Sequence, residues 1–199
     1  MVLKLVLISL IRLRINGLIS MSEIQISNPK AGELSKEEIN YTADLINRVY
    51  LITESDFWPQ NGDYERVNTQ ELTQFIEKDE LIIAKLGDEI VGAVHVYKNT
   101  ETVGGFGMLV SDPEKRGLKI GSKLVNAVEV WCKKRSCTQI QLELLKPDGK
   151  IHPDKEFLYK WYTRIGYEFQ SKTPYGDMYP ELASLLKIPC TFEVYLKNL

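Results

Sequence analysis

The amino-acid sequence predicts one α/β (α+β) domain, in which short strands alternate with amphipathic helices. Strand-like and helix-like hydrophobic patterns follow one another along the chain, with turn residues between them. The 199 residues are close to the size of one domain, and 44% hydrophobic with 26% charged residues is an ordinary globular composition. No repeat, linker or low-complexity segment interrupts the sequence, so we expect a single folding unit.

Residues 1–20 are rich in Leu, Ile and Val and contain no acidic residue, and we place them outside the core, as a leader or extension before the domain at 21–199. Lys4, Arg12 and Arg14 interrupt the run of about 18 to 20 apolar residues that a membrane span requires. In a secretory signal the basic residues come before the apolar core, whereas Arg12 and Arg14 come late in this segment. A mitochondrial presequence and an upstream extension of the reading frame both fit, and the sequence leaves this choice open.

The first half of the domain contains two capped helices and a hairpin. Residues 23–27 alternate as a short strand, and the capping box that starts at Ser35 predicts a helix to about residue 51. Asn68 or Thr69 caps a second helix that extends to about residue 78. Two strands at 81–86 and 90–97 follow, joined by the turn signal Gly87-Asp88.

The segment at 107–122 is the most informative part of the chain. An apolar strand at 107–110 leads through a basic, glycine-containing loop into a helix whose apolar face is formed by Ile120, Leu124, Val128 and Trp131. Such a strand, loop and helix N-terminus leave backbone N–H groups unpaired where the helix dipole also favours negative charge. We therefore predict a phosphate-binding loop, with the alternative that it is a charged turn that caps a surface helix. The residues assigned to it are Arg116, Gly117, Leu118, Lys119, Ile120, Gly121 and Ser122.

The remaining elements complete an α/β order. Residues 139–145 alternate as a strand, and 146–150 form a break with Pro and Gly. A helix that contains Tyr162 follows, and then strands at 167–170 and 191–196, of which the last pairs back into the sheet.

Two motifs resemble the GNAT acetyltransferase superfamily. The family signature is Arg or Gln, two free positions, Gly, one free position, and then Gly or Ala. Arg116, Lys119 and Gly121 occupy its three defined positions, with Lys119 in place of the first glycine. Residues 157–167 resemble the family's later helix, which carries a Tyr and ends in a Gly and an aromatic residue. The resemblance covers nearly all of residues 21–199 and implies a single GNAT-like domain with a mixed, mostly antiparallel central sheet flanked by helices.

The resemblance implies that acetyl-CoA is the co-substrate of this protein. Its pantetheine arm is expected between the strands at 107–110 and 139–145, where its amides pair with the backbone of Leu109 and Val110. Its diphosphate is expected at the N–H groups from Arg116 to Ser122. We expect no metal, because Cys132, Cys137 and Cys190 form neither a CxxC pair nor a zinc-like set with the histidines.

The family transfers the acetyl group directly from the thioester to an amine, and three residues are candidates for this chemistry. Tyr162 matches the family tyrosine that acts on the leaving thiolate, and its alternative role is a packed aromatic. An alkylammonium has a pKa of about 10.4 and must lose a proton before it attacks. Glu54, after the first helix, and Glu143, on the strand beside the thioester, are both candidate bases. Alternatively, Glu54 is a solvated loop carboxylate and Glu143 is a sheet-surface carboxylate paired with a lysine.

The predicted activity is an N-acetyltransferase acting on a primary amine of a small molecule. Two alternatives remain: an acyl-CoA-binding module without catalysis, and an acetyltransferase for a peptide or protein amine. A net charge of −2 argues against nucleic-acid binding through bulk electrostatics. We expect no membrane partner and a cytoplasmic protein, or a mitochondrial one if residues 1–20 are a presequence. The apolar edge near the last strand leaves a homodimer open.

Overall fold

The structure is a computed structural model that describes residues 23–59 and 65–199. The leader predicted at 1–20 lies outside these residues. Along the chain the elements are β1 (Ile24–Ser27), α2 (Lys36–Thr53), α3 (Thr69–Glu77), β2 (Leu81–Leu86), β3 (Glu89–Lys98), β4 (Val103–Ser111), the 3₁₀ turn η1 (Pro113–Lys115), α4 (Ile120–Lys134), β5 (Gln139–Pro147), α5 (Pro153–Arg164), β6 (Glu168–Pro174), α6 (Tyr175–Met178), α7 (Pro180–Ala183) and β7 (Cys190–Asn198).

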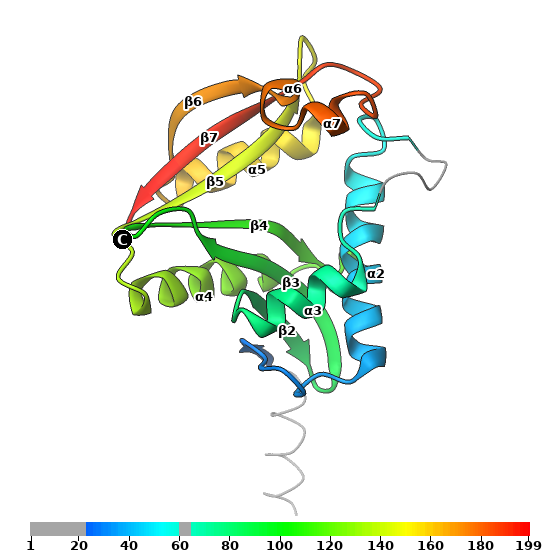
Figure 1. The fold of residues 1–199 in the computed structure, drawn as a ribbon, viewed down its shortest axis with the longest axis vertical. Coiled ribbons are helices and arrows are strands. Elements are labelled where there is room, and N and C mark those ends of the chain that lie inside the picture. The colour runs from blue at the N-terminus through cyan, green and yellow to red at the C-terminus, as the bar shows by residue number, and fades with distance from the viewer. Residues whose placement is uncertain (1–22, 60–64) are drawn as a thin grey trace, which may run out of the picture.

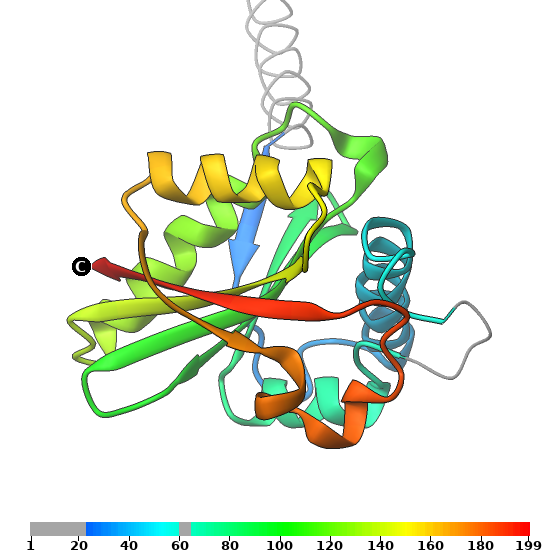
Figure 2. The same cartoon turned by 90° about the horizontal axis from the view of Figure 1, so that it is seen from above.

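The strands form one mixed sheet in the order β1-β2-β3-β4-β5-β7-β6. The neighbours β4 and β5 are parallel, and the other neighbouring pairs are antiparallel. Helices α4 and α5 cover one face, while α2 and α3 cover the other face of the first half of the sheet (Figures 1 and 2). This arrangement confirms the predicted α/β domain with a mixed, mostly antiparallel sheet flanked by helices.

The hydrophobic core has three parts that follow these layers. One cluster joins the sheet to α4 and α5 and includes Val94, Leu124 and Tyr162. A second joins the sheet to α2 and α3. A third packs Trp58, just after α2, against β5, β7 and the segment with α6 and α7. Residues of β4 belong to the first and second clusters, and residues of β5 to the first and third, so each of these strands is packed on both faces.

The two capping boxes form as the sequence predicts. Ser35 accepts from the Glu38 N–H and Asn68 accepts from the Glu71 N–H, and each Glu reaches back to the cap backbone. The predicted helix ends at 51 and 78 differ from the observed ends by two residues or fewer.

The central strand is longer than the predicted 107–110. β4 begins at Val103, so that Gly104 and Gly105 lie within it. Both glycines pair with β3, and Gly105 is a glycine because a Cβ there would come within 2.6 Å of the Tyr97 ring. Strands β6 and β7 are also longer than predicted, and the sequence did not predict the short helices α6 and α7.

Cys132, Cys137 and Cys190 are buried free thiols. Burial raises the pKa of Cys132 to about 12 and that of Cys190 to about 11, so both thiols are protonated at neutral pH.

In residues 23–59 and 65–199, no group of His, Cys, Asp and Glu side chains is arranged to hold a metal ion. None of the helices in this part of the chain is long and apolar enough to cross a bilayer.

Candidate active site

The site is built where β4 and β5 separate. The parallel pairing runs from Val103 opposite Gln139 to Phe106 opposite Leu142, and it goes no further. The two strands then diverge (Figure 1). β5 remains paired with β7 on its other side, so only its edge toward β4 is left open. The sheet thus exposes two strand edges that face each other, which is the geometry predicted to receive an extended pantetheine.

A bulge in β4 accompanies this divergence. Ala93 on β3 pairs with Val110, whereas His95 pairs with Gly107, so β4 has one residue more than β3 in this interval. Met108 has a φ of 50°, in the left-handed region. Leu109 lines the cavity beyond the bulge, while the side chain of Val110 packs in the core against α2 and α3.

A cavity of about 80 Å³ lies between the diverging strands. Its walls come from β4, β5, β7, α2, α5 and the loop before α3. The lining residues are Tyr50, Glu54, Arg66, Phe106, Gly107, Met108, Leu109, Leu142, Glu143, Leu144, Leu145, Lys155, Leu158, Tyr162 and Phe192. The three predicted catalytic residues, which are far apart in the sequence, therefore share one cavity.

Tyr162 lies on α5 and is 6% exposed. Its ring makes edge contacts with Phe106 and Tyr167 at centroid distances of 6.1 and 5.8 Å. Burial, and to a smaller extent the neighbouring Tyr50 and Tyr167, raise its pKa above the ordinary value. The hydroxyl therefore stays protonated at physiological pH and can act as a hydrogen-bond donor in the cavity.

Glu54 is not the solvated loop carboxylate that one interpretation of the sequence predicted. It is the C-cap residue of α2 and is 3% exposed. Its Oε1 accepts from the Lys155 Nζ at 2.5 Å and its Oε2 accepts from the Trp58 Nε1 at 2.8 Å. Lys155, in the first turn of α5, is 5% exposed, and its ammonium lies 5.3 Å from the centroid of the Phe57 ring. Sequence reasoning did not identify Lys155, because a lysine beside Pro153 in a helix start is typical of solvent-exposed positions.

Glu143 lies on β5 and is partly exposed. Its Oε1 accepts from the Gln141 Nε2 at 3.1 Å. The alternative prediction of a sheet-surface carboxylate had a lysine as this partner. Of the two candidate bases, Glu54 has both oxygens engaged by donors, one of them a cation, whereas the partner of Glu143 is neutral.

The histidines lie outside the cavity lining. His95 stacks on Phe75 at a centroid distance of 3.8 Å. Burial, with smaller effects from Lys78 and Arg66, lowers the pKa of His95 to about 4. The imidazole is therefore neutral at physiological pH and is a structural residue of the sheet.

The predicted phosphate loop connects β4 to α4. Asp112 anchors its start, because its buried carboxylate accepts from the Glu114 N–H at 2.9 Å and lies 3.8 Å from Arg48. Gly117 has a φ of 85°, and Lys119 has a φ of 57° and a ψ of 31°. In the described residues, no side chain caps α4 and its first turn holds no acid, unlike α2 and α3. The N–H groups of Ile120, Gly121 and Ser122 are thus at an uncapped helix start, where an anion is favoured.

The chain is similar to known acetyltransferases in sequence and in fold. The sequence model described as "Acetyltransferase (GNAT) family" matches residues 45–153, more than half of the chain. The match contains β4, the phosphate loop, β5 and both candidate bases, and it ends before Tyr162. A comparison with curated proteins found no significant match.

Solved acetyltransferase structures have the same fold. An aminoglycoside 6'-N-acetyltransferase complexed with coenzyme A is 17% identical, with a TM-score of 0.65 over 87% of this chain and 96% of that chain. Ard1 from Thermoplasma volcanium is 13% identical, with a TM-score of 0.61 over 88% and 97% of the two chains. An acetyltransferase from Elizabethkingia anophelis with acetyl-CoA bound is 14% identical, with a TM-score of 0.55 over 89% and 99%. At these identities the similarity shows the fold alone.

The left-handed backbone of Lys119 leads to a stability prediction. Replacing Lys119 by Gly removes the steric cost of a side chain in this conformation, and we expect the free energy of unfolding to rise by about 0.5 to 1 kcal/mol. The matched control is Lys123→Gly, which removes the same charge within the helix and should lower it by about 1 kcal/mol. Urea unfolding followed by circular dichroism measures both. Equal losses for the two variants would contradict the left-handed conformation of Lys119.

A second prediction concerns the buried ion pair. Lys155→Met leaves the Glu54 carboxylate buried without its cation, and we expect a loss of about 3 to 5 kcal/mol in the free energy of unfolding. The double variant Glu54→Gln, Lys155→Met has no buried charge and should recover most of this loss. The exposed Lys160→Met on the same helix is the control and should stay within about 0.5 kcal/mol of the parent protein. Denaturant unfolding of the four proteins measures these differences; a double variant no more stable than Lys155→Met would show that the pair does not act as a unit.

Proposed function

Because the chain belongs to the acetyltransferase (GNAT) family, we propose that it is an acetyl-CoA-dependent N-acetyltransferase that transfers the acetyl group directly to a primary amine of a small molecule. The observation that carries this proposal is the cavity between the diverging strands, which Tyr162, Glu143 and Leu109 line together. This reaction needs a hydrogen-bond donor for the leaving thiolate, a carboxylate for the amine, and open strand backbone for the pantetheine arm.

Two features of the chain fit acetyl-CoA. The open edge of β4 beyond Phe106 offers backbone groups to the amides of the pantetheine arm. The uncapped start of α4, with Lys119 and Lys123 nearby, offers N–H groups and positive charge to the diphosphate. Leu109 belongs to both the strand edge and the cavity, so a pantetheine that follows β4 delivers its thioester to the candidate catalytic residues.

In the proposed reaction Glu143 receives the acceptor as an ammonium and takes one of its protons. The resulting amine attacks the thioester carbonyl, the C–N bond forms and the C–S bond breaks. We propose Glu143 for this role rather than Glu54, because Lys155 and Trp58 already engage both oxygens of Glu54. A backbone N–H of the bulged β4 near Leu109 would face the developing oxyanion.

Tyr162 is proposed to act on the leaving thiolate. A thiol has a pKa of about 8.5 and a phenol one of about 10, so the phenol stabilises the thiolate chiefly as a hydrogen-bond donor. The burial that raises the pKa of Tyr162 keeps its proton in place for this purpose. The thiolate then leaves as free CoA after it gains the proton that the acetylated amine loses.

The small volume of the cavity supports a small-molecule acceptor over a peptide segment. The alternative of an inactive acyl-CoA-binding module was suggested by Lys119 in place of a glycine. Lys119 adopts a left-handed backbone, which glycine adopts without steric cost, so this substitution alone is weak evidence against a functional loop.

The proposal predicts acetyl-CoA binding and amine-dependent release of free CoA. Calorimetry measures acetyl-CoA binding to the full chain, and a thiol reagent then follows CoA release over a panel of small amines and peptides. Gly121→Trp is the control, because an indole at the start of α4 would cover the N–H groups and should abolish binding. Binding without release would favour the inactive module, release with peptides alone would favour the protein acceptor, and no binding would refute the proposal.

The proposed role of Tyr162 predicts that Tyr162→Phe lowers kcat by about 100-fold with a smaller change in KM, because the hydroxyl acts in the transition state. Tyr159→Phe is the matched control on the same helix; it is 37% exposed and should leave both constants unchanged. Steady-state kinetics with saturating acetyl-CoA measure the effect. Equal turnover in the two variants would assign Tyr162 to packing.

A further inference from the structure

A second hollow in the surface lies between α4 and the edge strand β1. It has a volume of about 570 Å³, and the described residues that line it are all different from those that line the cavity between β4 and β5. Its long walls come from β1 and α4, and Asp79, in the turn before β2, also lines it. We call this hollow the β1–α4 groove, and its size is that of a binding site.

One stripe of α4 forms a wall of the groove. It consists of Lys123, Ala127, Val130 and Lys134. Successive members are three or four residues apart, so they lie along one side of the helix. Val130 is 51% exposed, although it is apolar. With a rise of about 1.5 Å per residue, the two lysines are about 16 Å apart along the helix axis, and the apolar residues lie between them.

The opposite wall is β1, which offers an open backbone edge. β1 stands at one end of the sheet and pairs with β2. No strand within residues 23–59 and 65–199 pairs with its other edge. The backbone groups of such an edge can pair with an added strand. Ile26 of β1 lines the groove. The groove therefore offers an extended chain backbone pairing on one side and side-chain contacts on the other.

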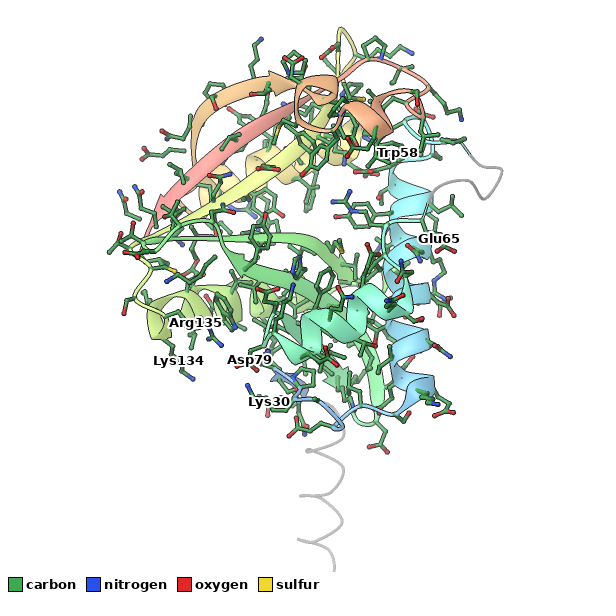
Figure 3. The ribbon with its side chains drawn as sticks, in the orientation of Figure 1. Lys30, Trp58, Glu65, Asp79, Lys134 and Arg135 are labelled. Atoms are coloured by element: carbon green, nitrogen blue, oxygen red, sulfur yellow. The ribbon has the colours of Figure 1, made fainter. Side chains whose placement is uncertain are left out.

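Contacts of Asp79 hold one end of the groove together. Its carboxylate accepts from the Lys30 Nζ and from the Arg135 Nη2, the latter at 2.9 Å. Its backbone oxygen accepts from the Trp131 Nε1 at 2.7 Å. Figure 3 shows Lys30, Asp79 and Arg135 together, with Lys134 beside them. Since Lys30 follows β1 and Arg135 ends α4, these contacts fix the distance between the two walls.

The groove carries an excess of positive charge. Four cationic side chains and one carboxylate line it, and this carboxylate, Asp79, is already engaged by two of the cations. Among the described residues, neither Lys123 nor Lys134 is in an ion pair. An occupant with negative charge at both ends and an apolar middle is thus complementary to the α4 stripe.

We propose that the β1–α4 groove docks an extended acidic segment of a partner protein, which adds to β1 as a further strand. Alternate side chains of such a strand face α4, so an acidic, an apolar and an acidic residue at every second position would meet the stripe. Charge favours this occupant over two others. The leader at 1–20 is basic and contains no acid, and a second copy of the chain would bring its own positive groove. The docking does not depend on the proposed acetyl transfer.

The probe is the capped peptide Ser-Glu-Thr-Val-Thr-Glu-Ser, whose two Glu and one Val share a face when the chain is extended. The matched control, Ser-Thr-Glu-Val-Glu-Thr-Ser, has the same composition but places both Glu on the face opposite to Val. Fluorescence anisotropy of the labelled peptides measures their binding to the full chain. We expect the probe to bind about 10-fold more tightly than the control, and the advantage to shrink at high salt.

Variants then assign the binding to the stripe. Lys134→Glu and Lys123→Glu should each lower the affinity for the probe by about 10-fold, because a cation is replaced by a like charge. Val130→Ser removes the apolar contact and should lower it by about 3-fold. The control is Lys160→Glu, an exposed lysine of α5 with the same change in net charge, which should stay within about 2-fold of the parent protein.

Backbone pairing has its own test. In an added strand, alternate N–H groups point toward β1 and the others point away. N-methylation of the probe at one set of alternate residues should therefore abolish binding, and N-methylation at the other set should leave it within about 3-fold. Hydrogen exchange at the amides of β1 should slow when the unmodified probe is bound.

Several outcomes would overturn the proposal. They are no binding of the probe, equal affinities for the probe and its control peptide, and an affinity that Lys134→Glu does not change. Equal effects of the two N-methylated sets would also overturn it, because the probe would then not bind as a strand. Displacement of the probe by acetyl-CoA would assign the groove to the co-substrate instead, whereas simultaneous binding of both is expected from their separate linings.

Discussion

The separation of β4 from β5 is the constraint on which the rest of this structure depends. A parallel pair that stayed joined would satisfy the backbone of both strands and leave no opening in the sheet. Here the pairing stops after Phe106 and Leu142, and the bulge at Met108 turns β4 away. β7 keeps the other edge of β5 paired, so β5 can leave β4 without leaving the sheet. The exposed backbone needs a partner, and a ligand with amides along its length can provide one.

Three hydrophobic clusters hold this opening apart, and each of them contributes to the wall of the cavity. Tyr162 belongs to the cluster under α4 and α5, and Leu145 and Phe192 belong to the cluster with Trp58. The Glu54 and Lys155 pair adds a polar link between α2 and α5 at the same place. Since buried ion pairs seldom add net stability over apolar packing, its value here is the fixed placement of two helices around the cavity.

The sequence predicted the order of elements well, because that order depends on local signals. Capping at Ser35 and Asn68, the turn at Gly87 and the apolar face of α4 all act within a few residues. The predictions failed where tertiary packing decides: β4 extends back through Gly104 and Gly105, and α6 and α7 pack in one cluster with Trp58 and Phe192. The candidate site shows the same division. Tyr162 and the loop at 116–122 followed from motifs, and Glu54 and Glu143 from their expected places after the first helix and on the strand beside the thioester. The role of Lys155 depends on its contact with Glu54, which is distant in the sequence.

The two halves of the site are supported differently, and this bears on how the protein would select its acceptor. The proposed co-substrate side consists mainly of backbone, namely the edge of β4 and the start of α4, and backbone groups depend little on side-chain identity. The proposed acceptor side consists of side chains from the end of α2, from the residue before α3 and from β5, with the α6 and α7 segment packed behind. A substitution at a partly exposed position there, such as Glu143, changes charge and shape while the hydrogen bonds of the sheet remain. A chain of this fold can therefore keep one donor and change acceptors.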